Sequence, residues 1–368
     1  MVYTFQKSRI TDTNEKLCAK KREENAAMIK PGRLFQGDTV AVVSPSWGCA
    51  GAPRVLWKFR QGCRRLEELG LKVVPAPNAL KGTSYLKSHP EARAEDLMWA
   101  FENKDVKAIV ASIGGSDSAR LFPYLSADVI AGHPKIVCGY SDVMSLHLYC
   151  YRLGLMTYYG DNLLTTIAES GCWHPYSRHW FEKTFFDASP IGRIDPSADW
   201  SCSMDRHTDP SYRKTYLPNP GYQYVQGKGI ARGRLFGGHG DLRTLCLPDG
   251  TPLVEKKDFE GAILFFEDIP EFCNEEYMAG FFDWLGSNGY LQVLSGVIIG
   301  KMRMEGSFRP YADRIREIVS GKYRCTALPV MGDLNFGHTS PVCILPYGAE
   351  AEINVDELTF TILESGVI

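Results

Sequence analysis

The chain has 368 residues, which is enough for two domains at roughly 150 residues each. Hydrophobic residues make up 44% of it and charged residues 23%, a composition typical of globular proteins and not of disordered ones. With 41 basic and 43 acidic residues its formal net charge is -2, so it lacks the positive charge of a dedicated nucleic-acid-binding protein. No apolar run approaches the roughly 18 residues that span a bilayer, so we expect no membrane partner. The 11 cysteines form no C-x-x-C pair, which disfavours a zinc ribbon and indicates reduced thiols in a cytoplasmic protein.

Strand and helix signals alternate in the first half of the chain. Asp38–Ser44 and Val106–Ser112 are short apolar runs rich in β-branched residues, and they predict buried strands. Arg54–Leu69 and Glu91–Asn103 carry helical patterns. Strands that alternate with helices predict βαβ units, a parallel sheet and right-handed crossovers. We also expect strands at Leu71–Val74, Ile136–Gly139 and Leu155–Tyr159, and helices at Ser118–Leu125 and Asp142–Leu153.

The composition changes after Asp187. Prolines recur between Ser189 and Gly221 among many Asp, Ser and Arg residues, which predicts a linker or lid loop instead of a packed element. The expected organisation is a polar extension at 1–30, an α/β domain at 31–188, the loop at 189–221 and a β-rich mixed α/β domain at 222–368. In the last of these we expect strands at Gly229–Phe236, Ala262–Glu267, Val293–Gly300, Val342–Leu345, Ala351–Val355 and Leu358–Leu363, and helices at Asn274–Leu285 and Tyr311–Val319.

A turn with two glycines follows the clearest strand and precedes a helix. Its sequence is I-G-G-S-D-S-A-R, Ile113–Arg120. Such a turn can hold a nucleophilic serine above a sheet, where free backbone N–H groups at the helix start stabilise an oxyanion. Ser116 and Ser118 are both candidates on pattern alone. The alternatives are that these residues cap the helix or that the turn cradles an anion.

Two further motifs carry groups for proton transfer. L-F-F-E-D-I-P, Leu264–Pro270, is a buried-type strand that ends in Glu267 and Asp268, which can face a ligand crevice or cap the next turn. N-F-G-H-T-S-P, Asn335–Pro341, places His338 in a glycine-containing loop, and histidine suits proton transfer near neutral pH. The chain order Ser, Glu, His is that of an acyl-transfer triad.

His239 and Asp241 form an H-x-D pair in G-G-H-G-D. Such pairs can bind metals, but no third ligand is identifiable by spacing, and catalytic zinc sites need three. We therefore expect neither a metal nor another cofactor.

Five short motifs in order are similar to those of the LD-carboxypeptidase family, the serine peptidases that include the microcin C self-immunity proteins. The resemblance covers about Pro31 to Leu363. It implies an N-terminal α/β domain and a more β-rich C-terminal domain with the site between them. It also implies a cytoplasmic, metal-independent and often dimeric protein. The motifs are G-D-T-V-A-V-V-S-P-S, the I-G-G-S-D-S turn, C-G-Y-S-D, L-F-F-E-D and F-G-H-T-S-P.

The same resemblance implies residue roles. The family pattern Gly-Gly-x-x-Ser puts the nucleophile at Ser118, Glu267 matches the family's glutamate, and His338 matches its base. The oxyanion donors would be the N–H of Ala119 and one from the Gly114–Gly115 turn.

Two substrate classes are compatible with this family. One is the murein tetrapeptide, from which the terminal D-alanine is removed; the other is an aminoacyl group amide-linked to a sulfamoyl- or phosphoramide-type nucleotide. The long segment after Ser118 resembles the second branch, in which an aromatic side chain stacks on the base, and we expect Trp180 or Trp200 in that role. His239 stands where the family usually has a substrate-side asparagine. The alternative of another class is a non-catalytic ligand-binding protein on the same scaffold.

Overall fold

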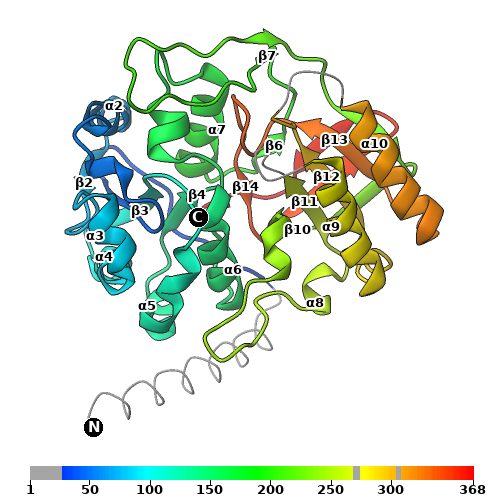
Figure 1. The fold of residues 1–368 in the computed structure, drawn as a ribbon, viewed down its shortest axis with the longest axis horizontal. Helices are drawn as coiled ribbons and strands as arrows, with labels where there is room; N and C mark the ends of the chain where they lie inside the picture. The colour runs from blue at the N-terminus through cyan, green and yellow to red at the C-terminus, as the bar shows by residue number, and fades with distance from the viewer. Residues whose placement is uncertain (1–26, 268–273, 304–307) are drawn as a thin grey trace.

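The computed structural model describes residues 27–267, 274–303 and 308–368. The first half of the chain forms one lobe and the second half forms the other (Figure 1). One lobe is built on a largely parallel six-stranded sheet and the other on a mixed eight-stranded sheet. The predicted fold class is therefore confirmed. No helix among these described residues is both long and apolar enough to cross a bilayer.

The first sheet is made of the short apolar runs predicted in the N-terminal half. Its strand order is β14-β5-β4-β3-β1-β2. Neighbours from β2 to β5 are parallel, and β14 joins the edge antiparallel. The central strands β3 and β4 are almost entirely buried, as parallel strands covered by helices must be. The bounds are β1 Thr39–Val43, β2 Lys72–Pro75, β3 Val106–Ala111, β4 Ile136–Gly139, β5 Tyr158–Tyr159 and β14 Leu345–Pro346.

Helices cover this sheet, and three of the observed helices lie within two residues of the predicted bounds. Pro90 occupies the first turn of α4, where its missing N–H costs nothing. Every residue of α6 is buried, because this helix lies between the first sheet and the second sheet. The bounds are α2 Leu56–Glu67, α3 Thr83–Ser88, α4 Pro90–Glu102, α5 Ala127–Gly132, α6 Met144–Arg152 and α7 Pro175–Phe186.

The second sheet has four parallel strands in its middle, β10-β11-β12-β13, with antiparallel strands outside them. Parallel strands end at the same edge of a sheet, so their carboxyl ends form one rim. The strand bounds are β6 Gly192–Arg193, β9 Gln223–Gln226, β10 Ile230–His239, β11 Ile263–Glu267, β12 Gly296–Gly300, β13 Val330–Leu334, β15 Glu350–Asn354 and β16 Thr359–Ile362; the helices are α8 Lys256–Phe259, α9 Glu275–Ser287 and α10 Arg309–Arg316.

Some expected elements differ from those observed. The tail run Val342–Leu345 does not form a strand of the second sheet. Instead β14 begins at Leu345 and pairs with β5 of the first sheet. The helix expected at Ser118–Leu125 is a 3-10 helix, η2, Ser118–Tyr124, because Pro123 lies inside it and cannot donate to an α-helical ladder. Strand β13 was not predicted.

The loop at 189–221 is largely irregular, as its prolines predict. Three short strands lie in it: β6 pairs with β16 of the second sheet, while β7 Asp199–Trp200 and β8 Leu217–Pro218 pair with each other. Ser201 pairs with Ser340, two residues beyond His338. A buried ion cluster also holds the loop: Lys214 lies 3.1 Å from Asp205 and 3.4 Å from Glu169, and Lys58 also pairs with Asp205. The ion cluster and the Ser201–Ser340 pairing thereby hold the loop beside the segment that contains His338.

Candidate active site

Glu267 and His338 form the buried pair that the sequence predicts. Glu267 is the last residue of β11, and its side chain is 1% exposed. Its Oε2 atom accepts hydrogen bonds from Nδ1 and from the backbone N–H of His338, both at 2.8 Å. Because a carboxylate only accepts, Nδ1 carries the proton and Nε2 is left free to act as a base. Asp268, the other acid expected at this strand end, lies outside the described residues.

Gly337 explains why this loop can approach the carboxylate so closely. Its φ is +95°, which favours glycine. A Cβ atom at this position would lie 2.1 Å from Glu267 Oε2. Any other residue here would push the carboxylate away from His338.

The charge state of Glu267 follows from its surroundings. Burial alone would raise its pKa. The positive charge of His338 and the hydrogen bonds from His338 and Tyr159 outweigh burial and hold the pKa of Glu267 below its usual range. The carboxylate is therefore ionised at neutral pH and can stabilise an imidazolium.

A strained serine lies at the carboxyl end of β4. Ser141 has φ +64°, an uncommon value for a residue other than glycine. It stands between β4 and the helical segment that begins with η3, Ser141–Val143, and continues into α6. A strand, a sharp turn and a helix form the arrangement that exposes a nucleophile in hydrolases. Such strain persists only where the surroundings enforce it, and it is concentrated at functional sites.

The predicted Gly114–Gly115 turn packs against this serine. A Cβ atom on Gly114 would lie 2.7 Å from Cβ and 2.9 Å from Oγ of Ser141. A Cβ atom on Gly115 would lie 2.2 Å from Ser46 Oγ. The turn must therefore be glycine to bring its backbone to the Ser141 side chain. It was predicted as an oxyanion donor, and its backbone lies beside the Ser141 side chain.

The structure does not bring Ser118 to the Glu267–His338 pair. Ser118 is fully buried, and its Oγ atom lies 2.6 Å from the carbonyl oxygen of Asp142 and 2.5 Å from Ser145 Oγ. Its backbone N–H donates to Asp142 Oδ2 at 2.8 Å. These contacts make Ser118 a support for the turn that carries Ser141. The oxyanion role predicted for Ala119 depends on Ser118 being the nucleophile.

His338 lies beside the Ser141 turn. The ring of Tyr140, the residue before Ser141, packs edge-on against His338 with a centroid distance of 5.0 Å. Sequence reasoning quoted the C-G-Y-S-D motif without assigning a role to its serine. The signal was available, because Tyr140 and Ser141 follow a buried strand and precede a helical segment just as the Gly–Gly turn does.

His239 reaches the same rim. It ends β10 and lies opposite Glu267 in the register of β10 and β11. Burial lowers its pKa, so the imidazole is neutral at pH 7. Nδ1 lies 3.6 Å from Asp241 Oδ2, while Nε2 is buried with no hydrogen-bond partner among the described residues. An orphaned buried nitrogen beside the triad rim can bind a polar substrate group.

The two tryptophans occupy different places. Trp180 lies on α7 and packs edge-on against Tyr176 and His179 as part of the hydrophobic core. Its position does not support stacking on a substrate. Trp200 lies in the 189–221 loop, next to the Ser201–Ser340 pairing, and Lys301 covers one face of its ring at 4.8 Å from the centroid. Trp200 is 7% exposed, as Trp180 is.

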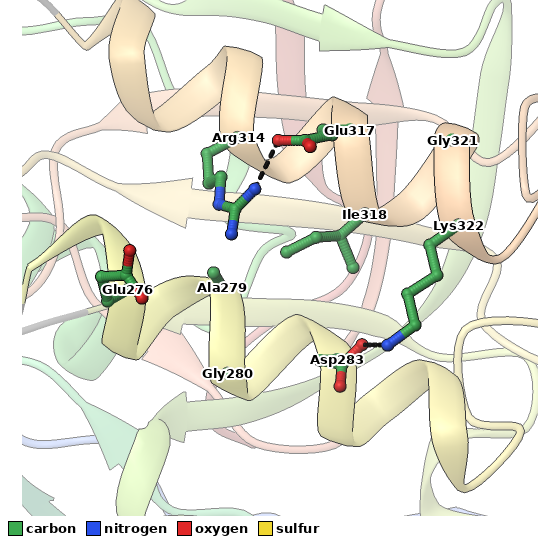
Figure 2. Close-up of a pocket in the computed structure, with 9 residues that line it drawn as sticks. All are labelled: Glu276, Ala279, Gly280, Asp283, Arg314, Glu317, Ile318, Gly321 and Lys322. Carbon is green, nitrogen blue, oxygen red and sulfur yellow. Dashed lines mark hydrogen bonds and ion pairs between the residues drawn. The ribbon is translucent and has the colours of Figure 1, made fainter.

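A separate cavity of about 540 Å³ lies between α9 and α10. Ion pairs between Arg314 and Glu317 and between Lys322 and Asp283 lie along it (Figure 2). It contains none of the candidate catalytic residues, so it is not the active site.

The structure thus has two lobes, with a strained serine after a strand of one sheet and a Glu–His pair at a strand end of the other. Residues 40–160 match the LD-carboxypeptidase N-terminal domain and residues 232–353 match the LD-carboxypeptidase C-terminal domain. This chain therefore belongs to the LD-carboxypeptidase family, a family of serine-type peptidases.

Three similar proteins illustrate the range of the family. A probable murein peptide carboxypeptidase of Bacillus subtilis is 30% identical over 92% of this chain and 95% of its own. An MccF-like protein from Streptococcus pneumoniae, solved in complex with AMP, is 30% identical with a TM-score of 0.78, covering 88% of this chain and 98% of its own. Microcin C7 self-immunity protein MccF, solved in complex with aspartyl sulfamoyl adenosine, is 25% identical with a TM-score of 0.79, covering 92% of this chain and 100% of its own.

Proposed function

We propose that this protein is a serine hydrolase that cleaves the amide bond of an aminoacyl nucleotide, with Ser141 as nucleophile, His338 as base and Glu267 as the residue that orients the base. One observation carries the assignment. The strained turn of Ser141 lies beside the Glu267–His338 pair, and Tyr159 hydrogen-bonds both the Ser141 backbone and the Glu267 carboxylate. Ser118, the nucleophile expected from the Gly-Gly-x-x-Ser spacing, is bonded into the support of that turn.

The mechanism follows from these positions. Nε2 of His338 takes the proton of the Ser141 hydroxyl as Oγ attacks the amide carbonyl. Backbone N–H groups of Asp142 and of the Gly114–Gly115 turn stabilise the oxyanion. Asp142 takes the role that was expected of Ala119, because Asp142 is the residue that follows the nucleophile. The protonated imidazole then gives its proton to the leaving nitrogen. Water, activated by the same histidine, releases the acyl group.

The nucleotide substrate is supported by the residues around the triad. His239 offers a buried nitrogen toward the rim, and Trp200 lies in the loop that pairs beside His338. A stacking ring and a polar contact are what a nucleoside with an acyl linkage requires. The nucleotide-bound structures of the two similar proteins favour the same class. We also propose a cytoplasmic homodimer.

A second candidate function is removal of D-alanine from murein tetrapeptide. It is favoured by the similarity to the probable murein peptide carboxypeptidase. This substrate is a peptide without a flat base, so neither Trp200 nor the long loop is needed to hold it.

The test separates these functions. Purified protein and the Ser141→Ala variant are incubated with an aminoacyl sulfamoyl adenosine and with murein tetrapeptide, and products are followed by mass spectrometry. Release of amino acid from the nucleotide alone, lost in the variant, is the expected result. Release of D-alanine alone selects the second function. If neither substrate is cut while the nucleotide binds, the protein is a ligand-binding member of the family and not an enzyme for these substrates.

A further inference from the structure

Tyr159 lies where the two lobes meet. It is one of the two residues of β5 in the first sheet, and it is fully buried. Its ring contacts Tyr140 of the serine turn at a centroid distance of 6.3 Å and Phe265 of β11 at 5.5 Å. The ring is thus held from both sheets, which fixes the position of its hydroxyl group.

The hydroxyl of Tyr159 joins the nucleophile's backbone to the carboxylate. It accepts a hydrogen bond from the backbone N–H of Ser141 at 3.1 Å, and it donates to Oε1 of Glu267. The direction is forced, because an amide N–H cannot accept and an ionised carboxylate cannot donate. One hydroxyl therefore links Ser141 and Glu267, which come from different sheets.

We propose that Tyr159 is a positioning residue that sets the strained serine turn against the Glu267–His338 pair; this inference rests on the proposed function. Its first effect is on the turn. Ser141 keeps a positive φ only if its backbone is held, and the bond from its N–H to Tyr159 is one such restraint. Its second effect is on Glu267. With Oε1 bonded to Tyr159, Oε2 is left to accept from the backbone N–H and from Nδ1 of His338.

The protonation of Tyr159 supports this role. Burial and the neighbouring Glu267 charge raise the pKa of Tyr159 well above its usual value. The hydroxyl keeps its proton throughout the working range of a hydrolase. It therefore acts as a fixed donor to Glu267 and does not compete with His338 for the proton of the nucleophile.

Tyr159→Phe removes this hydroxyl, and Tyr158→Phe is its matched control. Tyr158 is the preceding residue on the same strand, is equally buried, and donates its hydroxyl to the carbonyl oxygen of Gly366 away from the triad. Because a hydrogen bond to a charged group is lost, we expect kcat of Tyr159→Phe to fall roughly 10- to 100-fold, with KM changing less than about twofold. The control should stay within about threefold in kcat.

The pH profile separates positioning from general destabilisation. Without the donor, Glu267 attracts a proton more strongly, so the inactive protonated form of the Glu267–His338 pair persists to higher pH. The acid limb of kcat/KM should move upward by roughly half a pH unit in Tyr159→Phe and stay in place in Tyr158→Phe. A purely structural role would lower the melting temperature without moving this limb.

The titration of the Glu267–His338 pair can also be compared in the three proteins without any substrate. The pair is titrated in wild type and both variants through the spectra of ¹⁵N-labelled histidine. A higher midpoint in Tyr159→Phe alone supports the inference. Equal titration in all three proteins overturns it, whether or not the enzyme cuts the substrates tested. If wild type shows no hydrolysis that is lost in Ser141→Ala, this result counts against the proposed function instead. Failure of the inference about Tyr159 and failure of the proposed function are therefore distinguishable.

Discussion

Replacing each of the two serines by alanine gives opposite results if Ser141 is the nucleophile. Ser141→Ala removes the attacking oxygen but leaves the turn's backbone bond to Tyr159 intact. Ser118→Ala leaves the attacking oxygen in place but removes the hydroxyl that supports the turn. The first variant should lose activity and keep stability, and the second should lose stability and keep much of its activity.

The magnitudes come from the contacts. The Ser118 hydroxyl lies 2.6 Å from the Asp142 carbonyl and 2.5 Å from Ser145, and the Ser145 hydroxyl is left buried without this partner when it is removed. At about 1 kcal/mol for each net hydrogen bond, with an added penalty for unsatisfied partners, the loss is ~2–3 kcal/mol of unfolding free energy. Ser141→Ala should change that free energy by less than ~1 kcal/mol, but should lower kcat by a factor on the order of 10⁴ or more.

Three measurements on each variant decide the matter. Urea denaturation gives the unfolding free energy, and single-turnover kinetics with the cleaved substrate give the chemical rate. Intact mass after incubation with a fluorophosphonate locates the reactive serine. We expect a covalent adduct on wild type and on Ser118→Ala, and none on Ser141→Ala. An adduct that survives in Ser141→Ala and disappears in a stably folded Ser118→Ala would refute the assignment.

Most elements of the fold could be predicted because their signals are local. β3 and β11 are short runs of buried apolar residues, and their observed bounds lie within a residue of those expected. β13 was missed because Gly332 and Asp333 interrupt its apolar run, and both are weak strand formers. β14 could not be assigned to its sheet, since nothing in Leu345–Pro346 indicates that its partner is β5, far back in the chain.

The site was predictable only in part for a similar reason. Glu267 and His338 were chosen as a pair from sequence, and they are in contact. The two serine turns both follow a parallel strand and precede a helix, and β3 and β4 are neighbours, so the turns of Ser118 and Ser141 meet at one edge. Pattern alone cannot rank them. The backbone conformation distinguishes them, because Ser141 has positive φ and follows Tyr140, whose ring packs against His338, whereas Ser118 is bonded to the turn that carries Ser141.

Three further substitutions test other parts of this arrangement. Gly337→Ala should lower kcat about 100-fold or more in steady-state assays. The reason is that the new Cβ atom would lie 2.1 Å from the Glu267 carboxylate and would push this carboxylate away from His338. Activity within a few-fold of wild type would contradict this reasoning. Lys214→Met removes the cation that the buried carboxylates of Glu169 and Asp205 share, so it should lower the local stability of the loop by ~3–5 kcal/mol. Limited proteolysis within 189–221 should then be faster than in wild type. An unchanged cleavage rate would count against the ion cluster as the anchor of the loop. Asp161→Asn should stabilise the protein in a pH-dependent way. Burial raises the pKa of Asp161 well above its usual value, so the folded protein binds a proton that the unfolded chain has released, and stability falls as pH rises from about 4 through the folded pKa. Asparagine cannot ionise, so urea denaturation should show that the variant's free energy of unfolding is ~1–3 kcal/mol higher at pH 7 and little changed near pH 4. An equal gain at both pH values would show that ionisation of this carboxyl is not the cause.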